Sequence, residues 1–436
     1  MNNSESGISL FWFRRDLRLF DNAGLYHALK SKYSVLPIFI FDTDILEKLE
    51  DKDDSRVQFI YDQLTTLHSE LKKIDSSILI KIGKPLEVIK GLCNTFDIKS
   101  IFTNHDYEPY AKERDTSIAQ YLNTENIEFL TYKDQVIFEK NEVVSDSGNP
   151  YRVYTPYKNK WRLKLTEFFL KSYPIKEFRE NYLATPPYPI PSLAEIGFLR
   201  SQITFPSTNI DEKEIAIYDQ VRDFPAKAST SKLSIHLRFG TVSIREIAKA
   251  ASELNETWLN ELIWREFFMQ ILYHFPLVQD STFNTALNNF PWRHDESDFH
   301  KWCEGKTGYP LVDAGMREMN ATGYMHNRVR LVTASFLTKH LLLDYKWGEA
   351  YFARKLLDFD LASNNGNWQW AAGTGADAQP FFRIFNPTLQ QERFDKEFAY
   401  IKKWVPEYGT KTYPSPIVEH KFAVERAKKT FANFRR

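Results

Sequence analysis

The sequence predicts an α/β protein of two domains: an N-terminal doubly wound parallel-sheet domain of the Rossmann-like type and a C-terminal all-α domain. Three observations predict this fold. Apolar and amphipathic segments alternate over the first third of the chain, a proline-rich stretch follows, and from residue 211 the apolar periodicity is helical. The 436 residues are enough for two sizeable cores. We place the domains at 1–135 and 211–436, with a connector at 136–210.

The N-terminal alternation predicts a parallel sheet, because parallel strands need helical crossovers that cover both faces of the sheet. Right-handed crossovers make such a sheet doubly wound. Its first turn lacks G-x-G-x-x-G, so we do not expect a dinucleotide bound in the usual Rossmann manner. The predicted strands are 8–13, 35–41, 78–82 and 100–103, and the predicted helices are 22–29, 56–74, 85–96 and 112–123.

The stretch Ala184-Thr-Pro-Pro-Tyr-Pro-Ile-Pro191 separates the two domains. Clustered prolines cannot sustain a helix or a central strand, so this stretch is expected to be a semi-rigid connector. Beyond it, the period of 3.6 residues predicts helices at 244–254, 258–273, 311–319, 326–342 and 347–357.

The composition is ordinary in hydrophobic content, at 43%, but high in aromatic residues, at 15%. Eight of the ten Trp lie between Trp258 and Trp404, which indicates either a large helical core or a site that stacks on a chromophore or a base. Lys plus Arg equals Asp plus Glu, 57 each, so net charge gives no sign of a nucleic-acid partner. Any DNA contact would need a local basic patch.

The chain has no apolar run of about 18 residues and no signal-peptide pattern at its start. We therefore expect a soluble, cytoplasmic and monomeric protein with no membrane partner. Cys93 and Cys303 stand apart, without metal-ligand spacing, and are expected to be buried thiols in a reducing compartment. We expect no metal site.

Residues 358–387 gather acids, the adjacent amides of Asn364 and Asn365, Trp368, Trp370 and several glycines. Hydrogen-bonding groups beside indole faces suit a planar, polar, aromatic ligand. The alternative is a loop packed under helices with its Trp in the core.

Three other segments carry candidate site residues. Residues 230–234 could cradle an anion at a helix start, or could only cap that helix. In the 258–273 helix, Trp258, Glu261 and Arg265 share one face. This face could belong to a functional site, or Glu261 and Arg265 could form only an ordinary i,i+4 ion pair. Asn327 stands where a helix begins and could be only its cap.

The 358–387 stretch, together with Trp12-Phe-Arg-Arg-Asp-Leu-Arg18 and Asp21-Asn22, closely resembles the motifs of the photolyase/cryptochrome family. The resemblance covers essentially the whole chain and is closest to the class I photolyases of cyclobutane pyrimidine dimers (CPD). It implies that the helical domain binds FAD and that the chain is a deoxyribodipyrimidine photo-lyase, a carbon-carbon lyase. Its partner would then be damaged DNA that contains these dimers, repaired with blue light.

The resemblance implies an FAD site in which Asn364 lies beside flavin N5, Asp360 bonds the isoalloxazine edge, and Asp358 pairs with Arg330. The full implied set of cofactor-binding residues is Tyr218, Thr230, Ser231, Lys232, Leu233, Ser234, Trp258, Glu261, Arg265, Asn327, Arg330, Asp358, Asp360 and Asn364.

The resemblance also implies a lesion pocket walled by Trp264 and Trp370, with Glu261 at its junction with the cofactor. The implied catalytic residues are Glu261, Asn327, Trp264, Trp370 and Asn364, and the implied DNA-binding residues are Arg222, Trp264, Asn327, Arg328, Leu331, Trp370 and Arg383.

Positions 327 and 331 indicate the class of lesion. Enzymes of the family that repair the (6-4) photoproduct carry His at both positions, whereas this chain has Asn327 and Leu331. A CPD needs no comparable general acid, so the CPD class is favoured. Many CPD relatives have Met at 331, and Leu331 keeps the apolar surface but lacks the polarizable sulfur.

The family's three-Trp chain for photoreduction corresponds here to Trp368, Tyr345 and Trp292. Tyr345 departs from the pattern, because oxidation of Tyr is normally coupled to loss of a proton. We therefore expect slower or rerouted photoreduction, with Trp347 as a possible substitute or as a core residue.

A second antenna chromophore is possible, and its identity is open. Folate is less favoured, because Tyr110-Ala111 replaces the Asn-Glu pair of folate-binding relatives. Two other functions remain alternatives at this stage. One is a cryptochrome-type blue-light photoreceptor without repair, and the other is a helical nucleic-acid-binding protein with a nucleotide-type domain.

Overall fold

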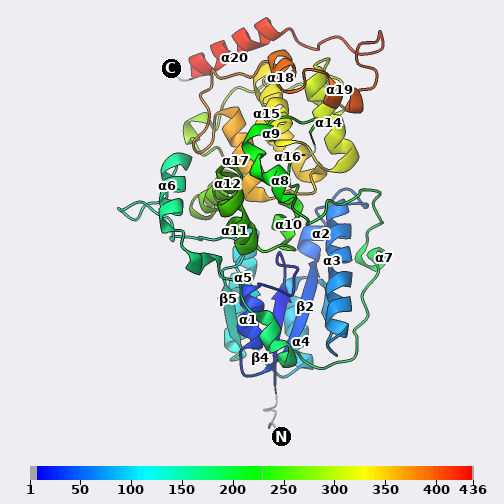
Figure 1. The fold of residues 1–436 in the computed structure, drawn as a ribbon, viewed down its shortest axis with the longest axis vertical. Coiled ribbons are helices and arrows are strands. Elements are labelled where there is room, and N and C mark those ends of the chain that lie inside the picture. The colour runs from blue at the N-terminus through cyan, green and yellow to red at the C-terminus, as the bar shows by residue number, and fades with distance from the viewer. Residues whose placement is uncertain (1–6, 228, 435–436) are drawn as a thin grey trace. The chain divides into compact units, whose positions relative to one another are not determined.

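The computed structural model describes residues 7–227 and 229–434, which form two compact units (Figure 1). The α/β unit comprises the chain up to Glu142, Lys164–Thr208 and Leu233–Ser252. The helical unit comprises Val143–Leu163, Asn209–Lys232 and the chain from Glu253. The segment 136–210, which we expected to be a connector, thus contributes to both units.

The α/β unit contains a five-stranded parallel sheet in the order β3-β2-β1-β4-β5. This confirms the predicted fold class. The strands are β1 (Ile8–Phe13), β2 (Ser34–Asp42), β3 (Leu79–Gly83), β4 (Ile98–Asn104) and β5 (Glu128–Tyr132).

Strand β5 was not predicted from the sequence. This strand lies at the edge of the sheet and its five residues are half-buried or exposed. Its short, mixed sequence therefore lacks the apolar run that identified the inner strands. The sheet's central strands β1 and β2 are almost wholly buried, as parallel strands covered on both faces should be.

Helices of the α/β unit connect the strands, and several start where the sequence supplies a cap or a proline. Asn22 and Asp54 accept hydrogen bonds from the first turns of α1 and α3, and Pro85 and Pro109 open α4 and α5. The helices are α1 (Ala23–Leu29), α2 (Thr43–Leu46), α3 (Ser55–Lys72), α4 (Pro85–Thr95), α5 (Pro109–Thr124), η1 (Glu167–Leu170), η2 (Ile175–Asn181), α7 (Leu193–Ile196), α10 (Ser234–Phe239) and α11 (Ile244–Leu254).

Four buried charged side chains cross-link distant segments of the α/β unit. Arg18 donates to Asp134 at 2.7 Å, and Arg245 donates to both Asp134 and Asp21 at 2.8 Å. All four are at most 6% exposed. Taken alone, the loop around Arg18 would be read as a charged surface loop. That interpretation is wrong, because partners more than a hundred residues away bury it.

Replacing Asp134 by Asn is expected to lower the free energy of unfolding by about 3–5 kcal/mol, since two buried guanidinium groups would lose their shared charge. Burial alone would raise the pKa of Asp134, but Arg18 and Arg245 lower it below the usual value. The stabilisation is therefore present above about pH 4 and is lost as the pH falls further. Urea denaturation at pH 7 and pH 3.5 checks this.

The matched control is Asp97→Asn, which breaks the exposed Lys99–Asp97 pair of the same unit and should leave the urea midpoint nearly unchanged. If Asp134→Asn and the control unfold at the same urea concentration at pH 7, the prediction is contradicted. A difference from wild type that grows as the solution is acidified would also contradict it.

The helical unit is built around a core in which α14, α15, α16 and α17 contribute most side chains. Two glycines allow close approach: a Cβ on Gly366 of α17 would meet the ring of Phe268 on α12, and one on Gly348 of α16 would meet the ring of Trp368. The helices are α6 (Tyr154–Lys164), α8 (Glu212–Ala216), α9 (Tyr218–Val221), α12 (Glu256–His274), η3 (Pro276–Gln279), η4 (Thr285–Leu287), α13 (Glu296–Cys303), α14 (Pro310–Thr322), α15 (Asn327–Ser335), the π-helix η5 (Phe336–His340), α16 (Tyr345–Lys355), α17 (Leu361–Ala372), α18 (Pro387–Phe394), α19 (Ala399–Trp404) and α20 (His420–Phe434).

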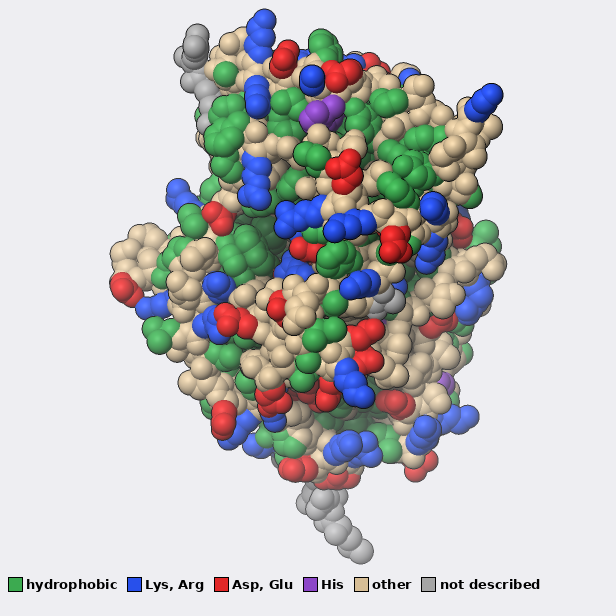
Figure 2. Space-filling view, turned by 45° about the horizontal axis from the view of Figure 1, so that its top comes forward, with side chains coloured by type: hydrophobic (Ala, Val, Ile, Leu, Met, Phe, Trp, Pro, Cys, Tyr) green, Lys and Arg blue, Asp and Glu red, His purple; other side chains and the backbone are tan. Residues whose placement is uncertain are grey.

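The surface mixes both signs of charge, as the balanced composition predicts. Figure 2 shows Lys and Arg side chains interspersed with Asp and Glu on the visible face. The two thiols differ: Cys303 is buried as expected, whereas Cys93 is only half-buried, so the prediction for Cys93 is wrong. Within residues 7–227 and 229–434, no helix has the length and apolar content needed to span a bilayer.

Candidate functional site

A cavity opens in the helical unit, between α15, α16, α17 and the turn that precedes α17. Amide, guanidinium, carboxylate and hydroxyl groups share its wall with apolar side chains. The lining residues are Asn327, Arg330, Leu331, Ala334, Phe352, Leu356, Asp358, Phe359, Asp360, Ser363, Asn364, Asn367, Trp368 and Ala371.

Two helix starts place polar groups at this cavity. Asp360 is the N-cap of α17, and its carboxylate accepts from the backbone N–H of Ser363 at 3.0 Å. His326 is the N-cap of α15, and its Nδ1 accepts from the N–H of Arg328 at 3.2 Å. Burial lowers the pKa of His326 to about 4, which keeps that nitrogen free to accept. Asn327 is therefore not the cap, and its side chain lines the cavity instead.

Arg330 and Asp358 form the predicted ion pair. Arg330 Nη2 lies 3.1 and 2.9 Å from the two carboxylate oxygens of Asp358, and Arg330 Nε donates to the carbonyl of Met325 at 2.7 Å. Burial would lower the pKa of Arg330, but the Asp358 carboxylate outweighs it and raises that pKa. The pair fixes the turn before α17 against α15.

The adjacent amides of Asn364 and Asn365 have different surroundings. Asn364 lines the cavity and donates from Nδ2 to the carbonyl of Glu349 at 3.1 Å. Asn365 points between helices and donates to the carboxylate of Glu349 and to the carbonyl of Val278, both at 3.0 Å. Burial raises the pKa of Glu349 to about 7, although the bond from Asn365 opposes this. Helix α16 thus orients both amides.

Glu261 lies on α12 outside the cavity lining and forms an ion pair with Arg222. Burial raises the pKa of Glu261, and Arg222 opposes that effect. Arg222 was expected to contact DNA. In this structure its guanidinium instead pairs with the Glu261 carboxylate of the same protein. Trp258 of the same helix is buried, and Arg265 is half-buried.

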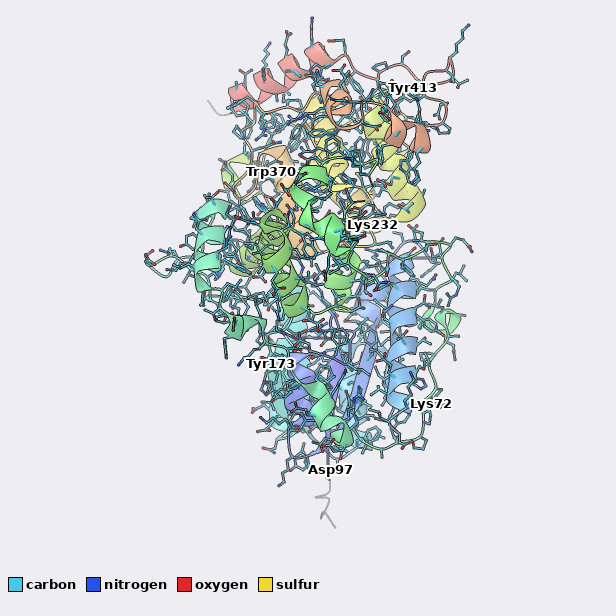
Figure 3. All side chains as sticks on the ribbon, in the orientation of Figure 1. Lys72, Asp97, Tyr173, Lys232, Trp370 and Tyr413 are labelled. Atoms are coloured by element: carbon cyan, nitrogen blue, oxygen red, sulfur yellow. The ribbon has the colours of Figure 1, made fainter. Side chains whose placement is uncertain are left out.

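Trp264, one turn beyond Glu261, stacks on Tyr154 of α6. The ring centroids are 3.5 Å apart and the planes differ by 7°. Trp264 and Trp370 both remain partly exposed, and Trp370 is labelled in Figure 3. Sequence reasoning missed Tyr154, because it lies about a hundred residues before Trp264 and in a segment interpreted as a connector.

The remaining DNA-binding candidates are spread over other segments. Arg328 donates to Asp223 at 2.7 Å, and its guanidinium carbon lies 4.6 Å from the ring centroid of Phe394. The guanidinium carbon of Arg383 lies 5.9 Å from the ring centroid of Phe385. Leu331 lines the cavity.

The segment 230–234 is divided between the two units. In the helical unit, Thr230 shares a hydrogen bond with the Tyr324 hydroxyl at 3.2 Å, and Lys232 Nζ lies 5.1 Å from the Tyr324 ring centroid (Figure 3). Ser231 is half-buried there, and Tyr218 is buried nearby in the chain. In the α/β unit, the N-cap of α10 is Leu233, without a side-chain hydrogen bond, before exposed Ser234. The interpretation as an ordinary side-chain cap is therefore wrong.

Aromatic rings lead away from Trp368, which lines the cavity. Its ring lies 6.1 Å from that of the fully buried Trp302, followed by Phe299 at 5.8 Å and Trp347 at a further 5.2 Å. Tyr345 is also buried, at the start of α16. Trp292 packs on Phe290 at 4.4 Å and on Phe431 of α20 at 6.1 Å.

Comparison with known proteins finds two family models on this chain. Residues 258–411 match the FAD binding domain of DNA photolyase, and residues 9–178 match DNA photolyase. The deoxyribodipyrimidine photo-lyase of Synechococcus sp. is 36% identical, over 94% of this chain and 93% of that protein.

Two solved structures are similar over nearly their whole length. A class III photolyase from Agrobacterium tumefaciens has a TM-score of 0.88 and 32% identity, covering 100% of this chain and 99% of that one. An archaeal photolyase from Sulfolobus tokodaii, solved with two FAD molecules, has a TM-score of 0.81 and 34% identity, covering 98% and 99%.

Proposed function

Because the chain belongs to the DNA photolyase family, we propose that it is a deoxyribodipyrimidine photo-lyase that splits cyclobutane pyrimidine dimers in DNA under blue light. One observation carries the proposal. The cavity of the helical unit brings together two chain segments, 327–330 and 358–364, whose residues Asn327, Arg330, Asp358, Asp360 and Asn364 the family resemblance assigns to the cofactor.

The residues present fit FAD. The cavity has apolar walls at Phe352 and Trp368 and converging hydrogen-bond donors and acceptors. When bound and reduced, FAD supplies light absorption and the single electron that opens the cyclobutane ring. We propose that Asp360 and Asn364 bond its flavin ring and that the Arg330–Asp358 pair holds this wall in place. The other residues proposed to bind the cofactor are Tyr218, Thr230, Ser231, Lys232, Leu233, Ser234, Trp258, Glu261, Arg265 and Asn327.

We propose that the dimer, flipped out of the duplex as in photolyases generally, stacks on Trp264 and Trp370. Both indoles are partly exposed, so part of each ring is free for contact. Glu261, whose pKa is raised by burial, and the amide of Asn327 are suited to hydrogen bonds with pyrimidine carbonyl and imide groups. Arg222, Arg328 and Arg383 would contact phosphates.

The proposed lesion is the cyclobutane dimer because neither Asn327 nor Leu331 can act as a general acid. Leu331 lines the cavity with an apolar surface. Assignment to class I remains a prediction, since a class III enzyme is among the similar structures. We further propose a monomer that acts in the cytoplasm and carries a second chromophore of open identity.

The test is repair by the purified protein, reduced and illuminated with blue light in the presence of an oligonucleotide that contains one thymine dimer. We expect a flavin absorption spectrum and restoration of intact thymine that stops in the dark. A flavin-bearing protein that restores no thymine would overturn the repair function in favour of a photoreceptor. A colourless protein without flavin would overturn cofactor binding itself.

A further inference from the structure

We propose that Tyr154 is a positioning residue for Trp264, and that Asp377 holds Tyr154 in place, so that the segment at the start of α6 sets the plane of one wall of the lesion pocket. The inference rests on the proposed function. It concerns a residue that neither composition nor spacing pointed to.

The stack itself constrains the indole. Tyr154 lies 3.5 Å from Trp264 with nearly parallel planes, and Phe267 meets the same indole edge-on at 5.6 Å and 85°. Phe268, one turn along α12 from Trp264, lies at 5.5 Å and 27°. A ring held from these directions cannot change rotamer without breaking aromatic contacts. The part of Trp264 that stays exposed is therefore presented in one orientation.

Tyr154 is itself fixed by two hydrogen bonds. Its hydroxyl donates to the carbonyl of Asn260 on α12 at 3.0 Å, one turn before Trp264. Burial, and then the charge of Glu261, raise the pKa of this hydroxyl, so it stays protonated and can donate. Its backbone N–H donates to Asp377 Oδ2 at 3.1 Å. Tyr154 is 7% exposed, so these contacts are largely shielded from water.

Asp377 connects this arrangement to the other wall. It follows α17, which carries Trp370, and its backbone has a φ of +48°, a left-handed conformation that Asp tolerates better than most residues. Tyr154 therefore touches both the helix of Trp264 and the segment after Trp370. A pocket whose two walls are fixed before binding loses less side-chain freedom when the dimer enters.

The expected role is in recognition of the lesion, because Tyr154 is absent from the lining of the cofactor cavity. Removing the ring should loosen Trp264 and weaken binding of dimer-containing DNA. Binding of undamaged DNA and occupancy by flavin should not change, since they depend on other groups. An aromatic stack of this kind is worth up to about tenfold in an equilibrium constant.

The experiment compares Tyr154→Leu, Tyr154→Phe, Asp377→Ala and the wild type, with Thr155→Ala, an exposed neighbour, as the matched control. Labelled oligonucleotides with and without one thymine dimer are titrated in the dark, and flavin occupancy is read from absorbance. Tyr154→Leu should bind the dimer about tenfold more weakly. Tyr154→Phe, which keeps the ring, should remain within about twofold of wild type, and Asp377→Ala should fall between them.

Tyr154→Leu that binds the dimer as tightly as wild type would overturn the inference. Equal losses of dimer binding, undamaged-DNA binding and flavin in Tyr154→Leu would show a merely structural role and also overturn it. If Tyr154→Leu does not fold, the order of Tyr154→Phe and Asp377→Ala decides the matter by the same readouts. A wild type that does not distinguish damaged from undamaged DNA would instead remove the proposed function, and this inference with it.

Discussion

Protein in which Asp358 is replaced by Asn is expected to purify with less than about a tenth of the wild-type flavin. Arg330 is half-buried, and the more deeply buried Asp358 is the carboxylate that receives its guanidinium in the cavity wall. A charge-assisted hydrogen bond of this kind is worth about 1.5–3 kcal/mol, which corresponds to about 10- to 150-fold in an equilibrium constant. The turn before α17 would lose its tie to α15, and the cofactor groups on that turn would lose their positions.

The measurement is the ratio of flavin to protein absorbance after purification, together with the melting temperature. Asn367→Ala is the matched control, because Asn367 also lines the cavity and belongs to α17 but is exposed, and its amide donates to Ser363 of the same helix. The control should keep nearly full occupancy. Asp358→Asn protein that keeps both its flavin and its melting temperature would contradict the role assigned to the pair.

The fold could be predicted where local pattern and burial agree. β1, β2 and β4 were found because parallel strands covered on both faces are continuous apolar runs. The edge strand β3 was found through the short apolar run Ile78-Leu-Ile80, and the other edge strand, β5, was missed because its sequence has no such run. The cross-links of Arg18 and Arg245 with Asp134 could not be predicted. Each charged residue is ordinary in its own sequence context, and only the folded chain brings them together.

The candidate site, too, could be predicted from the sequence only in part. The residue types of 358–387 indicated a polar aromatic ligand, and the cavity does gather Asp358, Asp360 and Asn364. Sequence could not show that His326 and not Asn327 caps α15, since both side chains can accept a backbone hydrogen bond. It also could not show that Tyr154 stacks on Trp264, because no periodicity relates residues so far apart.

Replacing Tyr345 by Trp is expected to speed photoreduction of the oxidised, flavin-loaded protein by at least about tenfold. This increase requires the activation free energy to fall by only about 1.4 kcal/mol. Tyr345 is 1% exposed, and burial, followed by the charges of Glu349 and Asp344, raises the pKa of its hydroxyl. Loss of its proton is therefore unfavourable, and oxidation of Tyr normally requires that loss. Oxidation of Trp does not require loss of a proton. Position 345 lies at the start of α16, and Gly348 of the same helix packs against the Trp368 ring.

The contacts of Trp368 offer a second path, through buried Trp302 and Phe299 to Trp347, and one further variant decides between the two. If electrons reach Trp368 through Trp302, Trp302→Phe should slow photoreduction of the wild type but leave Tyr345→Trp fast. If they come through Tyr345, Trp302→Phe should change nothing. Flavin absorbance under blue light with an external thiol gives the rates, and chemically reduced protein, whose dimer repair needs neither path, is the control. Equal photoreduction rates in wild type and Tyr345→Trp would contradict the prediction. If Trp302→Phe is also slow, electron transfer through Tyr345 does not limit the rate, and the electrons reach Trp368 through Trp302.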